Sequence, residues 1–190
     1  MISLRALPAT ALLAALLALA PACARKGSRG PRSSAASDAV LAAAVIDFHD
    51  GHVDTAGDAV GLAIRSAVTA RDLQLRELPA QVVTTRFPAL PEPDQRLAQL
   101  TTFGRDAAFL VLVEARAQYQ APAGARFRWL VHSRTSGDRP DVEGEPLITA
   151  IDIPVLIPGS GPREKEAVAA AAPAIGGQVA SLLDSLLVEP

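Results

Sequence analysis

The chain has 190 residues, and its 18 Lys and Arg side chains against 20 Asp and Glu give a formal net charge of −2. Acidic and basic residues are interspersed and aromatic residues are few, so the composition excludes the basic surface and stacking platforms of nucleic-acid-binding proteins. Only one cysteine is present, which excludes an internal disulfide. A domain of this size buries enough surface to fold without one.

An export signal peptide is predicted at residues 1–22. Arg5 gives a short positive start, and an apolar run of about 14 residues follows, which is too short for a comfortable bilayer span of about 20. Ala20 and Ala22 form the small-residue pattern that a signal peptidase accepts, and basic residues follow directly. The alternative is a buried N-terminal helix, but such a helix would need polar positions on one side.

Cys23 follows this signal, at the place where a bacterial lipoprotein is cut and lipidated. The segment from Leu19 to Cys23 resembles a lipobox, although Ala20 stands where leucine is commonest and Pro21 is unusual. The resemblance implies three acyl chains on Cys23, and several chains anchor a protein stably where one does not. Ala24 in place of aspartate implies outer-membrane sorting in lipoproteins of the enterobacterial kind. The alternative is ordinary cleavage before a free cysteine.

Residues 23–37 are predicted to form a tether between the anchor and a single domain at 38–190. The segment is rich in Gly, Ser and Pro and holds almost nothing apolar that could pack. Its four basic residues favour contact with anionic lipid headgroups, or they simply keep a spacer soluble.

The first half of the domain alternates strand and helix. A nearly continuous apolar run at residues 40–48 predicts a strand buried on both faces. A helix follows, capped by Asp54 or Thr55, with Asp58 in its first turn. Its buried stripe is predicted at Val60, Ile64, Ala67 and Val68. Residues 73–78 form a short strand or extended arm, and residues 82–87 are β-rich and predicted to pair or to run along an edge.

The second half adds an antiparallel portion. A helix is predicted from Pro91–Asp94 to Phe103, and a central strand begins at Ala107. Alternating residues at 113–120 and 126–135 predict a hairpin. The strand at 147–157 holds Pro154, which suggests an edge or a bulge. The last helix has Pro173 and a Gly-Gly pair, which predict a kink or a late start. The order β-α-β-α-β-β-β-α predicts an α/β fold with a mixed sheet.

This order resembles the domain shared by the curli-secretion lipoprotein, the amino-terminal domain of TolB and the lipoproteins that activate penicillin-binding proteins. The matching features span residues 38–187: the first strand ends in Asp47-Phe48, a strand follows Gly104-Arg105-Asp106, antiparallel strands end in Thr135-Ser136-Gly137, and a helix closes the domain. The resemblance implies a domain that binds partner proteins rather than one that catalyses a reaction. The chain departs from it in lacking amphipathic strands long enough for a secretion pore.

A cluster of histidine and aspartate at residues 47–54 is the densest group of chemically active side chains. His49 and His52, with Asp50 or a neighbouring carboxylate, supply the ligand types that zinc or another transition metal prefers. The cluster follows a predicted strand, where ligands often bind in open α/β sheets. Its spacing matches no known metal motif, and the alternative is a solvated turn in which Asp50-Gly51 makes a tight bend.

These observations lead to one hypothesis and two alternatives. The first is an exported lipoprotein, anchored by lipid on Cys23 in the outer membrane and facing the periplasm, whose domain binds a protein or another envelope component. No cofactor and no nucleic-acid partner are predicted for it. The alternatives are a metal-dependent enzyme that uses His49 and His52, and a structural envelope protein without a ligand pocket.

We expect the native protein to lack residues 1–22 and to carry acyl chains on Cys23, because the cysteine stands at the predicted cleavage site. Intact-mass spectrometry of the membrane-extracted protein measures both properties. A native product that keeps Met1, carries no acyl group and is found in the cytosol would contradict the prediction.

Overall fold

The computed structural model describes residues 38–87, 93–159 and 163–188, all of which belong to one compact unit. The strands are β1 (Ala39–Asp47), β2 (Val53–Thr55), β3 (Gln74–Glu77), β4 (Phe109–Ala123), β5 (Arg126–Asp138) and β6 (Leu147–Pro158). The helices are α1 (Gly57–Thr69), α2 (Ala80–Arg86), α3 (Pro93–Phe103) and α4 (Glu164–Val188).

The strands form one mixed sheet in the order β2-β1-β4-β5-β6. Strand β1 pairs with β4 in parallel on one edge. On its other edge, residues 39–42 of β1 pair with β3 in parallel, and residues 45–47 of β1 pair with β2 in the antiparallel direction. The remaining pairs, β4 with β5 and β5 with β6, are antiparallel. Among the described strands, β6 is therefore the outer strand on its side of the sheet.

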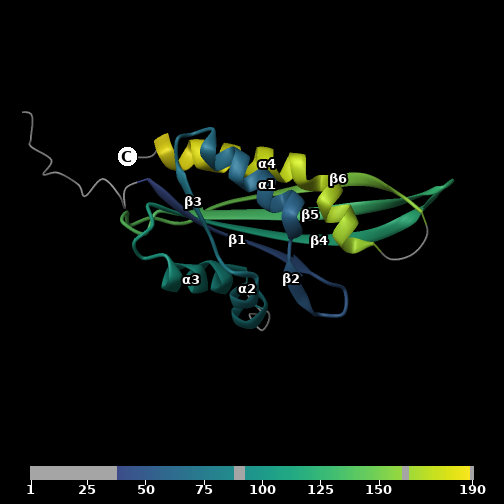
Figure 1. Cartoon of the computed structure of the whole chain (residues 1–190), viewed down its shortest axis with the longest axis horizontal. Coiled ribbons are helices and arrows are strands. Elements are labelled where there is room, and N and C mark those ends of the chain that lie inside the picture. The colour runs from purple at the N-terminus through teal and green to yellow at the C-terminus, as the bar shows by residue number, and fades with distance from the viewer. Residues whose placement is uncertain (1–37, 88–92, 160–162, 189–190) are drawn as a thin grey trace, which may run out of the picture. The chain divides into compact units, whose positions relative to one another are not determined.

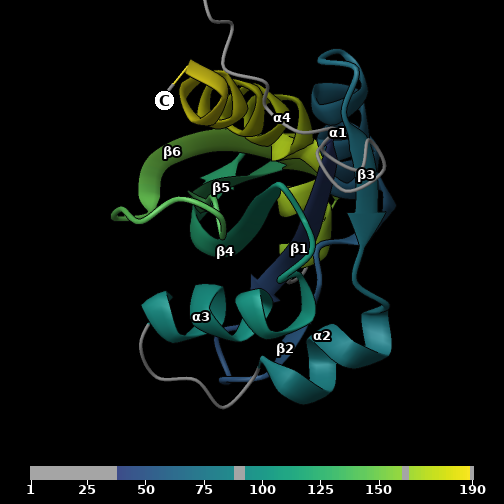
Figure 2. The same cartoon turned by 90° about the vertical axis from the view of Figure 1, so that its left-hand side faces the viewer.

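Helices lie on both faces of the sheet. Figures 1 and 2 show α1 and α4 on one side and α2 and α3 on the other. Because side chains alternate along a strand, β1 feeds both cores: Val40, Ala42 and Ile46 pack with α1 and α4, whereas Leu41, Ala43 and Val45 pack with α2 and α3. The core under α1 and α4 is the larger and extends over β5 and β6, which contribute nothing to the core under α2 and α3.

Helix α4 covers β4, β5 and β6 as a core helix. It is long and apolar enough, by length and composition alone, to cross a membrane. Eleven of its residues are buried, however, and nine of them belong to the larger core. Figure 1 shows the helix bending along its length, and Pro173 lies inside it, where it removes one backbone donor and crowds the preceding turn.

The α/β class is confirmed, and the eight predicted elements occur in the predicted order. The predicted stripe of α1 is buried at all four positions. The hairpin is formed by β4 and β5, with a two-residue turn at Gly124-Ala125. The strand that contains Pro154 lies at the edge, as predicted.

The prediction of β structure at residues 82–87 is wrong, because Ala80–Arg86 forms helix α2. Pro79 has a φ of −56° at the N-cap, which presets the chain for a helix start. Val83 and Phe87 are then four residues apart on one helix face, and both are buried in the core under α2 and α3. Tertiary packing thus overrides the β propensity of the valines and threonines.

Two further details differ from the sequence prediction. Residues 53–55 form the short strand β2 inside what was predicted to be a turn. The predicted caps of α1 are also wrong, because the N-cap residue is Ala56 and no side chain caps the helix. Asp54 and Thr55 pair with Ile46 and Val45 of β1 instead, so the helix begins only after this pairing ends.

A polar network connects α4 to the sheet. Gln178 on α4 is buried, and its Oε1 accepts a hydrogen bond from the Ser133 hydroxyl at 2.9 Å. Its Nε2 donates to the carbonyl of Thr149 at 2.9 Å. One side chain thus bridges β5 and β6 beneath the helix, and its polar atoms have the partners that burial requires.

We expect Gln178→Leu to lower the free energy of unfolding by about 1–3 kcal/mol, because the change leaves Ser133 and Thr149 without their buried partner. Urea denaturation measures the difference. Gln95→Leu is the control, since Gln95 is exposed on α3, and it should change stability by less than about 0.5 kcal/mol. Equal effects of the two substitutions would show that the network contributes nothing.

Candidate functional site

Part of the sheet is covered on one side only. On the side opposite α4, alternate residues of β4, β5 and β6 face outward, and no described helix packs over β5 and β6 there. We call this surface the open face. Its residues are Arg116, Gln118, Arg128, Leu130, His132, Arg134, Ile148, Ala150, Asp152, Pro154 and Leu156.

A buried ion cluster lies beside the open face, where α3 meets β1 and β4. The guanidinium of Arg96 donates two hydrogen bonds to the carboxylate of Asp47, at 2.6 and 2.8 Å, and one to Oε1 of Glu114 at 2.7 Å. Its Nε donates to the carbonyl of Phe87 at 3.2 Å, at the end of α2. The side chain of Arg96 is only 8% exposed. This bidentate pairing is the geometry for which arginine is best suited.

The environment of this cluster shifts two of its pKa values. Asp47, and then Glu114, raise the pKa of Arg96 against the opposing effect of burial, so the arginine stays charged. Burial raises the pKa of Glu114, and Arg96 only partly offsets that effect. Oε2 of Glu114 is buried and has no hydrogen-bond partner among the described residues. Glu114 is therefore an acidic group with one unused acceptor.

A cavity of about 310 Å³ opens next to this cluster on the open face. It is lined by six titratable side chains: Asp47, Glu114, Arg116, His132, Arg134 and Asp152. Two of the strand rows explain how they converge. Glu114, Arg134 and Ala150 form one row across β4, β5 and β6, and Arg116, His132 and Asp152 form the next. A cleft lined by several titratable groups, one of which is the buried carboxyl of Glu114 with its raised pKa, is a candidate binding site.

Partners across these rows hold the lining residues in place. Nδ1 of His132 lies 2.6 Å from the carboxylate of Asp152, and Arg134 donates to Asp94 of α3 at 2.7 Å. No ion pair joins Arg116 to another residue within the described ranges, and its side chain is exposed. Arg116 is thus the cation of the cavity that is available to a ligand.

A larger cavity, of about 510 Å³, lies along the edge of β1 at residues 42–44, between the part of the strand that pairs with β3 and the part that pairs with β2. It is lined mainly by alanine, glycine and aliphatic side chains. Two of its charged residues, Arg65 and Glu77, pair with each other at 3.0 Å. We therefore regard the smaller cavity as the better candidate, because it combines a buried carboxylate with an arginine that makes no ion pair to any other described residue.

The predicted metal ligands lie on an exposed turn between β1 and β2. His49, Asp50 and His52 are all exposed, and the backbone N–H of His52 donates to Oδ1 of Asp50 at 3.1 Å. The ring of His52 stacks on Phe48 with centroids 4.5 Å apart. Within the described residues, no group of three or more His, Cys, Asp or Glu is placed to hold a metal ion. The metal site stays a prediction.

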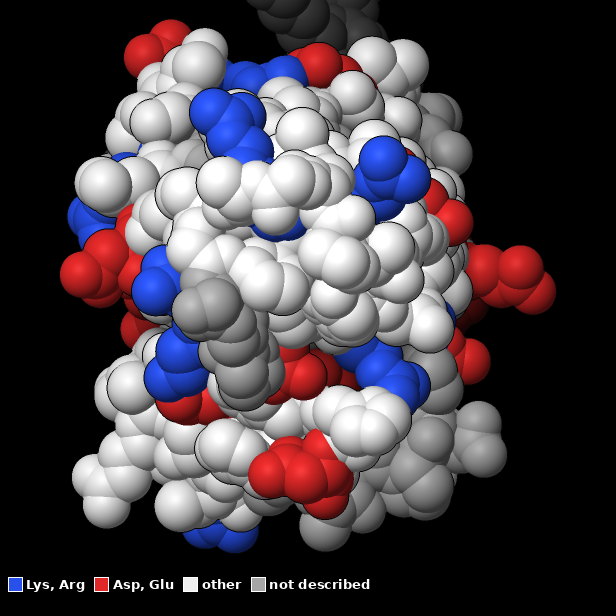
Figure 3. All heavy atoms as spheres, turned by 90° about the vertical axis from the view of Figure 1, so that its right-hand side faces the viewer, with Lys and Arg blue, Asp and Glu red and all other residues white. Residues whose placement is uncertain are grey.

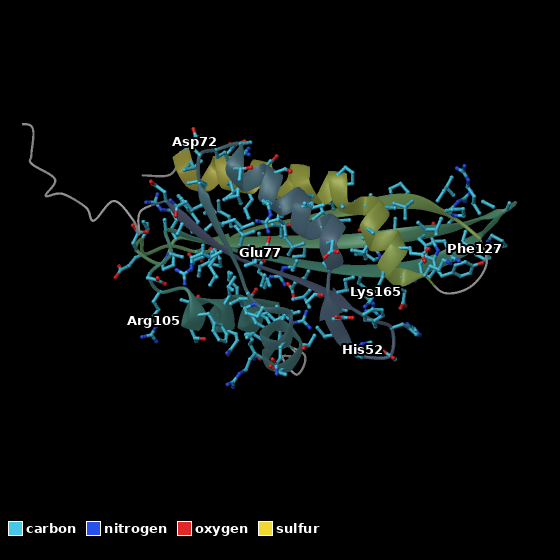
Figure 4. All side chains as sticks on the ribbon, viewed as in Figure 1. His52, Asp72, Glu77, Arg105, Phe127 and Lys165 are labelled. Atoms are coloured by element: carbon cyan, nitrogen blue, oxygen red, sulfur yellow. The ribbon has the colours of Figure 1, made fainter. Side chains whose placement is uncertain are left out.

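An ion pair fixes the position of this turn relative to α4. Lys165 in the first turn of α4 donates to Asp54 of β2, and that hydrogen bond holds the pKa of Asp54 below its usual value. Figure 4 shows His52 and Lys165 at the same end of the domain. Cys23 lies outside the described residues, so its predicted lipidation also stays a prediction.

Sequence reasoning included Asp47 in the polar cluster after β1 but missed Arg96 and Glu114. Glu114 carried a signal, because it is the first charged residue after the apolar run that begins at Ala107. A charge at that point of a central strand indicates a buried partner. No pattern in the sequence indicated that Arg96 would be buried, because it lies on a short helix far along the chain from Asp47 and Glu114.

We expect Arg96→Met to lower the free energy of unfolding by about 3–5 kcal/mol, because Asp47 and Glu114 lose their shared counter-ion in a buried place. Chemical denaturation measures the loss. Arg105→Met is the matched control, since Arg105 is exposed and points away from the domain (Figure 4). It should be close to neutral. A loss below about 1 kcal/mol for Arg96→Met would place the cluster among weak surface pairs.

No family model and no curated protein matches the sequence. Among solved structures, the chain is similar to the PelC dodecamer protein from Paraburkholderia phytofirmans (10% identity, TM-score 0.39, 81% of this chain and 89% of that one). It is also similar to the rare lipoprotein B from Shewanella oneidensis, with 12% identity and a TM-score of 0.34 over 78% of this chain and 98% of that one. A minor lipoprotein from Acinetobacter baumannii is similar as well, with 11% identity and a TM-score of 0.31 over 76% of this chain and 92% of that one. Two of these three proteins are lipoproteins by description. All three TM-scores are low, and a likeness of this extent assigns no function.

Proposed function

We propose that this protein is an exported lipoprotein, anchored in the bacterial envelope through Cys23, whose α/β domain binds a protein partner through the open face. The observation that carries the binding role is that no helix of the described ranges covers that side of β5 and β6. A sheet normally buries an apolar face against another layer. Here Ile148 and Leu156 stay 45% and 49% exposed.

Charge indicates what kind of surface the partner presents. Arg116 and Arg128 on the open face, and Arg126 at the hairpin turn, have no ion-pair partner among the described residues. Figure 3, which faces the hairpin end, shows a broad uncharged area with Lys and Arg side chains around it and with Asp and Glu side chains below it and at its margins. Complementary charge steers protein association and selects partners. The proposed partner is therefore a protein with acidic side chains around a small apolar centre.

The buried cluster supports this role by making the surface rigid. Arg96 and its two carboxylates tie α3 to β1 and β4, and Asp94 of the same helix holds Arg134. A preorganised surface loses less conformational entropy when it binds. The cluster thus positions the boundary of the open face without needing to touch the partner.

Site-specific photocrosslinking in cells tests the proposal. A benzophenone amino acid at Leu156 should give a discrete protein adduct in the envelope fraction, whereas the same probe at Leu62 should not. Leu62 is a matched control, because it is 62% exposed on α1, away from the open face. Arg128→Glu should reduce the Leu156 adduct several-fold, because it places an acid against the partner's acids.

Two results would contradict the proposed partner. The first is the same adduct from Leu62 and Leu156, which would show non-specific capture. The second is a Leu156 adduct that Arg128→Glu leaves unchanged, or one that contains only lipid or polysaccharide.

A further inference from the structure

We propose that the end of the β4–β5 hairpin lies in the headgroup layer of an anionic lipid bilayer. We call this part, residues 119–127, the hairpin tip. It is separate from the open face, and the inference rests on the proposed function only for the attachment of the chain to a membrane at Cys23. The lipid is defined by its chemistry, a phospholipid with net negative charge.

The hairpin tip projects from the domain and ends in small residues. Figure 1 shows β4 and β5 extending past α4, and Figure 4 shows Phe127 near that end. The chain between Tyr119 and Arg126 holds no charged side chain, and Pro122, Gly124 and Ala125 are exposed. Such a turn has few polar side chains to desolvate when it enters a headgroup layer.

Aromatic side chains lie directly behind this turn. The ring centroid of Tyr119 lies 5.7 Å from that of Phe127 and 5.5 Å from that of Trp129. Trp129 is only 3% exposed and belongs to the larger core, whereas Tyr119 is 46% exposed. Tyrosine combines an apolar ring with a polar hydroxyl, and it is enriched at the boundary between water and hydrocarbon. An exposed tyrosine at the end of a projecting hairpin suits that boundary.

The charge of the hairpin selects an anionic surface. Residues 115–137 hold four arginines and no Asp or Glu, although the whole chain has a net charge of −2. Arg126 begins β5, is exposed and makes no ion pair to another described residue. The adjoining end of β6, residues 153–158, is uncharged. Basic side chains beside an uncharged tip are attracted to anionic lipid headgroups.

The length of the chain allows the hairpin tip to reach the membrane that holds the anchor. Asp38 lies at the opposite end of the sheet, because β1 runs parallel to β4 and pairs with its first residue at Val40. The 15 residues of β4 extend about 46 Å. The segment from Cys23 to Asp38 spans up to about 50 Å when extended. One bilayer can therefore contact both the anchor and the tip, with the sheet lying along its surface.

Quenching of tryptophan fluorescence by brominated lipid tests the contact. Trp129 is the only tryptophan of the chain, so Tyr119→Trp combined with Trp129→Phe moves this reporter to the exposed position. The full chain is reconstituted in phosphatidylglycerol vesicles with brominated acyl chains. We expect the tryptophan at 119 to lose at least about threefold more of its fluorescence than a tryptophan outside the tip, because interfacial aromatic rings adjoin the acyl chains.

Leu62→Trp in the same Trp129→Phe background is the reporter outside the tip. Leu62 is 62% exposed on α1, so it also shows whether the helical side of the domain lies on the membrane. If the double variants fail to fold, the unaltered chain still reports more weakly, since the ring of Trp129 lies 5.5 Å from that of Tyr119.

A charge reversal tests the role of the arginine. Arg126→Glu should reduce the quenching several-fold, because one basic residue near an anionic surface contributes about fivefold to affinity. Arg105→Glu is the matched control, since Arg105 is exposed and lies outside the hairpin. It should leave the quenching unchanged, whereas vesicles of neutral phosphatidylcholine should reduce it.

Three results would overturn the inference while the chain still floats with the vesicles, which would leave the anchor standing. They are equal quenching at positions 119 and 62, quenching that Arg126→Glu leaves unchanged, and equal quenching in neutral and anionic vesicles. A chain that does not float with the vesicles contradicts the anchor and the inference together.

Discussion

The packing of α4 across β4, β5 and β6 determines which parts of this domain are covered and which are not. Nine of its eleven buried residues, together with the stripe of α1, close the larger core on one side of the sheet. On the other side, α2 and α3 are the only helices among the described residues, and the core beneath them reaches no further than β4. The outer two strands are therefore covered on one face only. The open face, with its cavity and its arginines, follows from this unequal distribution of helices.

The ion cluster around Arg96 lies at the boundary between the covered and the open parts of that second side. It connects α3 and the end of α2 with two central strands. Such a cluster contributes little net stability compared with apolar packing, because three charged groups lose their hydration. Its role is better described as positional: it fixes α3 and places the Glu114 carboxylate at the edge of a cavity. The raised pKa of Glu114 reflects the burial of its carboxyl group at that place.

The sequence was informative wherever a local pattern decided the structure. The stripe of α1, the hairpin of β4 and β5 and the edge position of β6 all follow from spacing, alternation or proline. It was misleading where tertiary packing decided the secondary structure. The valines and threonines of α2 favour a strand, but the helix is the conformation in which Val83 and Phe87 are buried together. The candidate site was visible only in part, since Asp47 lies in a recognisable cluster whereas its counter-ion Arg96 lies 49 residues away. No periodicity links such residues, and only the folded sheet brings them together.

The outer strand β6 has a consequence for how the domain behaves at high concentration. A long outer strand exposes backbone donors and acceptors that can recruit strands from other molecules, which is a common start of fibril growth. Pro154 lies within β6 and Pro158 is its last residue, and neither has an N–H to donate. Asp152 adds an exposed charge to the same strand. The strand thus buries its apolar residues against α4, while its prolines and its charge disfavour pairing with other molecules at its outer edge.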